Sequence, residues 1–96
     1  MAEVIHKAPE KIATGNAEAV MKLLADAASK AISEPDKTLV VDMADTAYIS
    51  SAGIRALMTS MKRIRAAGGT FVLRNVSERV REIIDLTGIQ AFVKIE

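Results

Sequence analysis

The sequence predicts an α/β fold, in which three helices combine with a central sheet of about four strands, mixed but mostly parallel. Two patterns support this prediction. Short apolar runs alternate along the chain with longer segments in which apolar residues recur every three or four positions, as on one face of a helix. Glycine, proline and serine residues separate these segments. Strands that alternate with helices are joined by crossover connections, which make neighbouring strands parallel.

The first predicted strand covers residues 3–7, and Pro9 follows it closely. Because proline cannot donate a backbone hydrogen bond, this strand is expected to lie at an edge of the sheet or to end there. The first helix is expected to begin at Asn16, a residue type that caps helix N-termini, and to end before Pro35. Its buried stripe is predicted to contain Val20, Leu24, Ala27, Ala28, Ala31 and Ile32.

The second strand is predicted over residues 38–41, immediately before Asp42. Its continuous apolar character indicates a strand that is buried on both faces. A second helix is expected to begin near Ser50 or Ser51 and to stop at the glycine pair 68–69. The apolar stripe of this helix is predicted to contain Ile54, Leu57, Met58, Met61 and Ile64.

The last third of the chain repeats the strand–helix alternation. A strand is predicted over residues 70–73, and Ser77 is expected to cap a third helix that ends at Gly88. Residues 91–95 are predicted to form the final short strand. The sequence contains no repeat and no long linker, so residues 1–96 are expected to form a single domain.

The composition excludes several classes of function. The net charge is only +1, which argues against a binder of nucleic acid or of a membrane surface. The chain has no cysteine and one histidine, His6, so it lacks the usual residues of a metal cluster or a catalytic triad. No apolar run approaches the length of about 20 residues that a membrane span needs. We therefore expect a cytoplasmic protein that is not an enzyme and needs no cofactor and no metal.

The most informative segment runs from Tyr48 to Ile54, where two adjacent serines and two small residues open a helix. A phosphate at this point would meet unpaired backbone N–H groups and the positive end of the helix dipole. The plain structural interpretation of Ser51 is that it caps the helix and does nothing more. Physics alone leaves both interpretations open.

This segment resembles the STAS domain, the fold of bacterial anti-sigma-factor antagonists. In that family an apolar strand leads through a loop to an aromatic residue, an apolar residue, and then Asp-Ser-Ser/Thr-Gly-Leu at the start of a helix. The corresponding residues here are Tyr48-Ile49-Ser50-Ser51-Ala52-Gly53-Ile54. The Gly68-Gly69 step into the next strand and the Thr87-Gly88 pair after the third helix also resemble the family pattern. The resemblance covers residues 16–96 and implies a STAS-like α/β sandwich.

The resemblance also implies a function, namely partner switching. The family's phosphorylated serine corresponds to Ser51, and Ser50 is the second choice. The implied protein partners are an anti-sigma factor that is also a serine kinase, and a phosphatase; the chain itself would be a monomer or weak dimer. The implied partner-binding residues are Ser50, Ser51, Ala52, Gly53, Ile54 and Arg55. The sequence departs from the family pattern where Ser50 replaces the motif aspartate and Ala52 replaces the second hydroxyl residue.

Three alternative interpretations compete with this one. The chain could be the STAS subunit of a lipid-trafficking ABC transporter, which would bind its ATPase without phosphorylation. It could be a phosphoryl carrier or a small enzyme with Ser51 as nucleophile, although no residue at a recognisable spacing would act as its base. Asp42 and Asp45 could hold Mg²⁺, although acidic residues in loops are more often turn formers.

A basic stretch on the second helix allows two interpretations of its own. It consists of Arg55, Lys62, Arg63 and Arg65. These side chains form either a solvated face that complements the helix dipole or a surface for an acidic partner.

Overall fold

The computed structural model describes residues 3–96 and confirms the α/β class. Four strands form the main sheet in the order β1-β3-β5-β6, and all its ladders are parallel, so the expected mixed pairing is absent from the described residues. A small second sheet pairs β2 with β4, also in parallel. The strands are β1 (Val4–Lys7), β2 (Lys11–Ile12), β3 (Thr38–Asp42), β4 (Tyr48–Ile49), β5 (Thr70–Arg74) and β6 (Lys94–Ile95).

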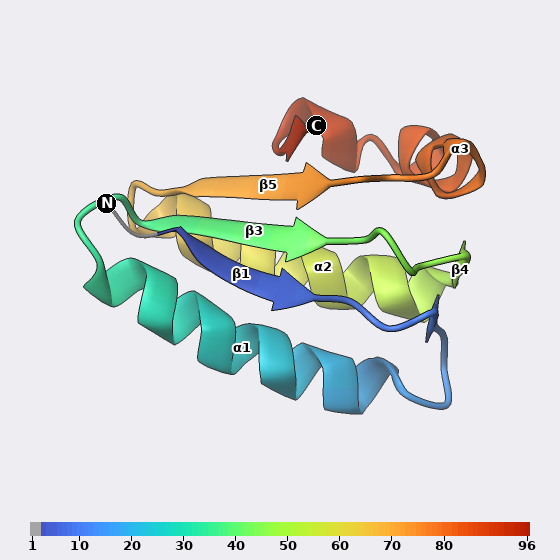
Figure 1. The fold of residues 1–96 in the computed structure, drawn as a ribbon, viewed down its shortest axis with the longest axis horizontal. Coiled ribbons are helices and arrows are strands. Elements are labelled where there is room, and N and C mark those ends of the chain that lie inside the picture. Colours follow the sequence, from blue (N-terminus) through green and yellow to red (C-terminus); the bar gives the residue numbers. More distant parts are fainter. Residues whose placement is uncertain (1–2) are drawn as a thin grey trace.

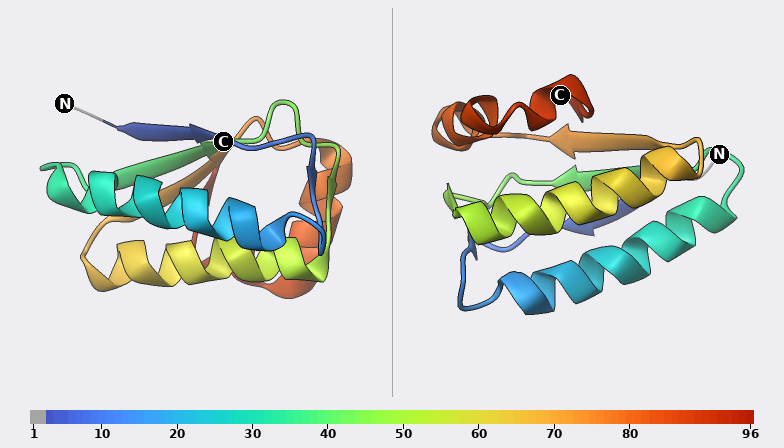
Figure 2. Two further views of the ribbon diagram at one scale, coloured as in Figure 1. Left: turned by 90° about the horizontal axis from the view of Figure 1, so that it is seen from below. Right: turned by 180° about the vertical axis from the view of Figure 1, so that it is seen from behind.

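Three α-helices and one turn of 3-10 helix accompany the strands. They are α1 (Ala17–Ser33), α2 (Ser51–Ala66), α3 (Glu78–Thr87) and the 3-10 turn η1 (Ile89–Ala91). Helices α1 and α2 lie side by side against one face of the main sheet (Figure 2). Helix α3 lies past the ends of the strands and contacts β4 (Figure 1). Among the described residues, no helix is long and apolar enough to cross a membrane.

Alternation along the strands and the apolar stripes of the helices build the core. Leu39 and Val41 of β3 and Phe71 and Leu73 of β5 point to the same side and pack against α1 and α2. Val40 points to the opposite side and is nevertheless fully buried, as expected for a strand covered on both faces. The helical face of the sheet thus supplies most of the hydrophobic burial that stabilises the fold.

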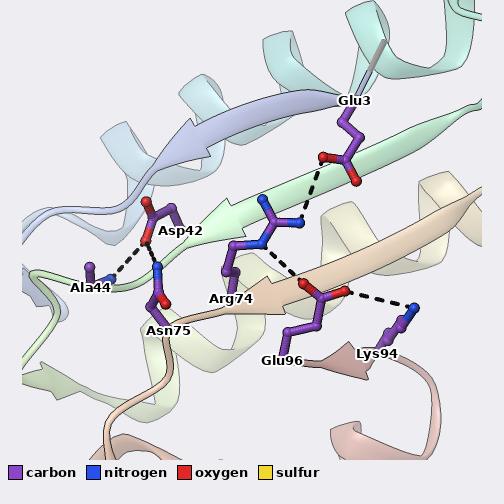
Figure 3. Close-up of polar contacts among 7 residues, drawn as sticks. All are labelled: Glu3, Asp42, Ala44, Arg74, Asn75, Lys94 and Glu96. Atoms are coloured by element: carbon purple, nitrogen blue, oxygen red, sulfur yellow. Dashed lines mark hydrogen bonds and ion pairs between the residues drawn. The ribbon is translucent and has the colours of Figure 1, made fainter. Parts of the chain in front are cut away.

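Ionic side chains, rather than a helix, lie across the opposite face of the sheet (Figure 3). The guanidinium of Arg74 is 3.0 Å from a carboxylate oxygen of Glu96 and 3.6 Å from one of Glu3. The ammonium of Lys94 lies 3.7 Å from the other oxygen of Glu96. These pairs join the beginning of β1, the end of β5 and the C-terminal residue, although such partly exposed pairs contribute little stability individually.

The first and last strands follow the sequence predictions to different degrees. The first strand is an edge strand that stops before Pro9, as predicted. The final strand predicted over residues 91–95 is present but shorter than expected, because residues 89–91 form the turn η1 and only Lys94 and Ile95 pair with β5. Gly88 adopts a left-handed backbone conformation with φ 78°, and this lets the chain turn from α3 directly into η1.

Candidate functional site

The N-terminus of α2 is held in place by the two-residue strands β2 and β4. Ile12 pairs with Ile49 in the parallel ladder, and both side chains are buried. The backbone amide of Ser50 then donates to the carbonyl oxygen of Ile12 at 2.8 Å. The N-terminal segment of the chain therefore fixes the point at which α2 begins.

The two serines at this helix start have different roles. Ser50 is the N-cap, with an extended backbone, and its Oγ accepts a hydrogen bond from the amide of Gly53 at 3.3 Å. Ser51 is the first residue inside the helix and is exposed. No hydrogen bond joins the Ser51 hydroxyl to another group among residues 3–96. The capping role considered for Ser51 thus belongs to Ser50, and the hydroxyl of Ser51 remains accessible.

The next two residues of the motif face the protein interior. A β-carbon at Gly53 would lie 2.7 Å from the carbonyl oxygen of Ile12 and 2.7 Å from the side chains of Ile12 and Ile49. Only glycine allows α2 to approach β2 and β4 this closely. Ile54 is 4% exposed and belongs to the core. The sequence placed Gly53 and Ile54 in the partner-binding set. In the structure both are buried, and they hold the start of α2 against the core.

The accessible part of the site is formed by other side chains. Ser51 and Arg55 are exposed, and Ala52 is partly exposed. Tyr48 is 42% exposed, and the parallel ladder places the exposed residue Lys11 beside it. Sequence reasoning did not include Tyr48 and Lys11 in the site. Tyr48 stands in the motif itself, whereas Lys11 lies on a strand too short for its pattern to be detected.

The loop before α1 borders the same site. Asn16 stands at the N-cap position of α1, but its side chain makes no capping hydrogen bond. Its Oδ1 accepts from the amide of Ala13 at 2.8 Å, and its Nδ2 donates to the carbonyl oxygen of Lys11 at 2.7 Å. The predicted cap is therefore a loop clamp, which holds the chain between β2 and α1 next to the start of α2.

The two aspartates considered for Mg²⁺ make separate contacts, and Figure 3 shows those of Asp42. Asp42 accepts hydrogen bonds from the side chain of Asn75 at 3.1 Å and from the amide of Ala44 at 3.0 Å. These two hydrogen bonds lower the pKa of the Asp42 carboxyl group. Asp45 lies 3.3 Å from the ammonium of Lys7. No group of three or more potential metal ligands occurs among residues 3–96. Asp42 acts as a turn former, because its side chain accepts from the backbone amide two residues later.

Electrostatics at the start of α2 favour an anion. The first turn of the helix contains no acidic residue. The amides of Ser51 and Ala52 have no acceptor among residues 3–96, as is usual for a helix N-terminus. The partial positive charge of the helix dipole adds to the charges of Lys11 and Arg55. The site can therefore accommodate a negatively charged group with little cost to the fold.

The chain is similar in sequence to known proteins. The anti-sigma-B factor antagonist of Bacillus subtilis is 28% identical over 64 residues, which are 67% of this chain and 59% of that protein. The chain thus spans less than two thirds of the length of this curated relative.

Two solved structures have the same fold. An anti-sigma-factor antagonist (STAS) domain protein from Planctomyces limnophilus gives a TM-score of 0.83 at 18% identity, over 100% of this chain and 90% of that chain. The Bacillus cell fate determinant SpoIIAA in its phosphorylated form gives a TM-score of 0.69 at 15% identity, over 98% of this chain and 82% of that chain. The family model of the STAS domain matches residues 3–96, so this chain belongs to the STAS domain family.

Proposed function

We propose that this protein is an anti-sigma-factor antagonist that works by partner switching. In its unmodified form it binds a regulatory protein that is both an anti-sigma factor and a serine kinase. Phosphorylation of Ser51 ends this binding, and a phosphatase restores it. The observation that carries the proposal is the division of labour between the serines: Ser50 caps α2, whereas the Ser51 hydroxyl is exposed and free to accept a phosphate.

The surroundings of Ser51 suit both states of the proposed switch. A phosphoryl group on its Oγ would lie at the positive end of the α2 dipole, near the free amides of Ser51 and Ala52. Arg55 is exposed one helical turn later, at the i+4 spacing that lets side chains interact. The modification is therefore compatible with the folded protein, and its effect falls on the binding surface.

The cost to the complex follows from charge and desolvation. Phosphorylation adds about −1.5 to −2 charges at neutral pH. A loss of about 3–4 kcal/mol at the interface weakens binding by a factor of several hundred. Burying a doubly charged group without a prepared partner can supply that penalty. One covalent change at the centre of the surface is thus sufficient to separate the two proteins.

The proposed binding surface is centred on the start of α2. Ser51, Ala52 and Arg55 offer the accessible contacts on the helix, and Tyr48 and Lys11 extend the surface over β4 and β2. Tyrosine and arginine are enriched among the residues that dominate binding energies in protein interfaces. The proposed role is therefore binding, with the chain as ligand and phosphorylation substrate rather than catalyst.

Phosphopeptide mapping tests the proposal. The protein is purified from cells that express it naturally, and intact mass and phosphopeptides are compared for wild type, Ser51→Ala and Ser50→Ala. One added phosphate is expected in wild type and in Ser50→Ala, and none in Ser51→Ala. A phosphate that maps to Ser50 would keep the switch but move its residue.

Co-purification with the same three proteins supplies the second arm. A kinase-like ATPase that binds the unmodified protein and releases the phosphorylated one is expected. Absence of phosphate under all growth conditions, together with recovery of a transporter ATPase, would contradict the proposal and support the ABC-transporter role instead.

A further inference from the structure

A groove beside the C-terminal half of α2, several helical turns after Ser51, has no role in the proposed function. Its volume is about 460 Å³. One wall is the C-terminal half of α2, with Met58, Met61 and Arg65, and the other is the segment between α3 and β6, with Ile89 and Phe92. The volume falls within the range of about 300–1,000 Å³ that is typical of small-ligand pockets.

The interior of the groove is apolar and adaptable. Met61 and Ile89 are 4% and 2% exposed and form its floor. Met58 is partly buried, and the ring of Phe92 is 51% exposed at the side. Flexible methionine side chains can adjust to an alkyl or aryl group. An exposed phenylalanine beside a preformed apolar groove gains burial when such a group binds.

The charged groups that line the groove are both cationic. Lys62 and Arg65 belong to the lining, and no carboxylate of the described residues does. Neither cation forms an ion pair with a carboxylate among residues 3–96. The guanidinium of Arg65 lies over the ring of Phe92, 5.2 Å from its centroid. This contact holds Arg65 at the groove while leaving N–H donors in its plane for a ligand.

The position of the groove restricts the charge of its ligand. The C-terminal ends of α2 and α3 both lie close to it, and helix C-termini carry partial negative charge. Two cations offset this charge for a single carboxylate but not for a polyphosphate. We therefore propose that the groove binds a single-chain amphipathic carboxylate, with its apolar chain on Met58, Met61 and Phe92 and its carboxylate on Arg65 and Lys62.

Methionine methyl groups provide the test, with decanoate as the probe. The full chain is labelled with ¹³C at the methionine methyls, and decanoate is titrated below its micelle concentration. The methyl signals of Met58 and Met61 are expected to shift and saturate, while those of Met21 and Met43, which lie outside the groove, stay unchanged. Decylamine, which has the same chain and the opposite charge, is expected to bind more weakly than decanoate by a factor of about ten or more.

Two sets of variants separate the charge from the cavity. Lys62→Ala/Arg65→Ala is expected to weaken decanoate binding about tenfold, whereas Lys30→Ala, which removes an exposed cation on α1 outside the groove lining, leaves it unchanged. Ala66→Leu keeps both cations but fills part of the groove, and it is expected to abolish the saturable shifts. Ala66 is exposed, so this variant is expected to fold, and circular dichroism checks that it does.

Three outcomes would overturn the proposal. The first is the absence of saturable shifts at Met58 and Met61. The second is equal binding of decylamine and decanoate, which would show an apolar surface that does not select ligands by charge. The third is a shift of both methyls with protein concentration alone, accompanied by dimers in sedimentation; a second copy of the chain would then occupy the groove.

Discussion

The α-carbon of Gly53 faces the carbonyl oxygen of Ile12 so closely that a β-carbon there would lie 2.7 Å from that oxygen. This contact connects the start of α2 to the strand β2, although Ile12 precedes Gly53 by 41 positions in the sequence. The contact fixes where the helix begins and therefore which serine becomes its cap.

Replacement of Gly53 by alanine should destabilise the protein by about 2 kcal/mol, because the new methyl group overlaps a backbone oxygen that cannot move aside. Helix propensity alone would predict the opposite sign, since alanine is the better helix former. Urea unfolding measures the difference. The matched control is Gly15→Ala, where nothing lies within 4 Å of the added carbon, and a change within about 0.5 kcal/mol is expected. Equal effects of both variants would contradict the close approach.

The two serines of the motif should differ in stability as well as in modification. Ser50→Ala removes the hydrogen bond from the Gly53 amide and should cost about 1 kcal/mol. Ser51→Ala removes an exposed hydroxyl and should change stability by less than about 0.5 kcal/mol. Ser77→Ala, which removes the corresponding cap of α3, serves as the reference for a lost cap. A larger loss in Ser51→Ala than in Ser50→Ala would reverse the assignment.

Phosphoserine at position 51 should stabilise the isolated protein by about 0.5–1 kcal/mol, because it lies at the positive end of α2. Arg55→Ala should remove about 0.3–0.5 kcal/mol of this gain, through loss of the i, i+4 pair. The measurement is thermal unfolding of protein with phosphoserine incorporated at 51, at low and at high salt. Because exposed charges are screened, the gain should shrink at high salt. Lys62→Ala, a cation outside the reach of Ser51, should leave the gain unchanged.

The single histidine should make stability depend on pH. His6 lies on β1, its Nε2 is buried without a hydrogen-bond partner among residues 3–96, and burial lowers its pKa. The unfolded chain therefore binds a proton at higher pH than the folded protein does. Stability from this group is fully present above the unfolded pKa of about 6.5 and falls as the pH drops below it.

Urea midpoints between about pH 7.5 and pH 5 measure this effect. His6→Gln, which cannot gain a proton, should show a smaller decrease than wild type. The lowered pKa of Asp42 acts in a more acidic window, because a carboxyl group with a depressed pKa loses its contribution only as the pH falls towards its own range. Identical decreases in wild type and His6→Gln would show that other groups dominate.

Local signals predicted most of the helices and strands. The apolar stripes gave α1 and α2, and Ser77 and Gly88 delimit α3 as their residue types suggest. Those signals act within a few residues, so a single sequence is enough to detect them. The short strands β2 and β4 escaped prediction because two residues carry no periodicity, and they exist only because each pairs with the other. The prediction that Asn16 caps α1 was wrong, because its side-chain hydrogen bonds depend on how the preceding loop folds back.

The sequence by itself determined the α/β order, the STAS-like motif and the presence of two hydroxyl groups at the start of a helix, because composition and spacing encode local preference directly. Only the tertiary structure decided which serine caps α2, which motif residues are buried, and that Lys62 and Arg65 line an apolar groove with Phe92. Those properties depend on contacts between segments distant in the chain, and their geometry is set by packing that no local pattern records.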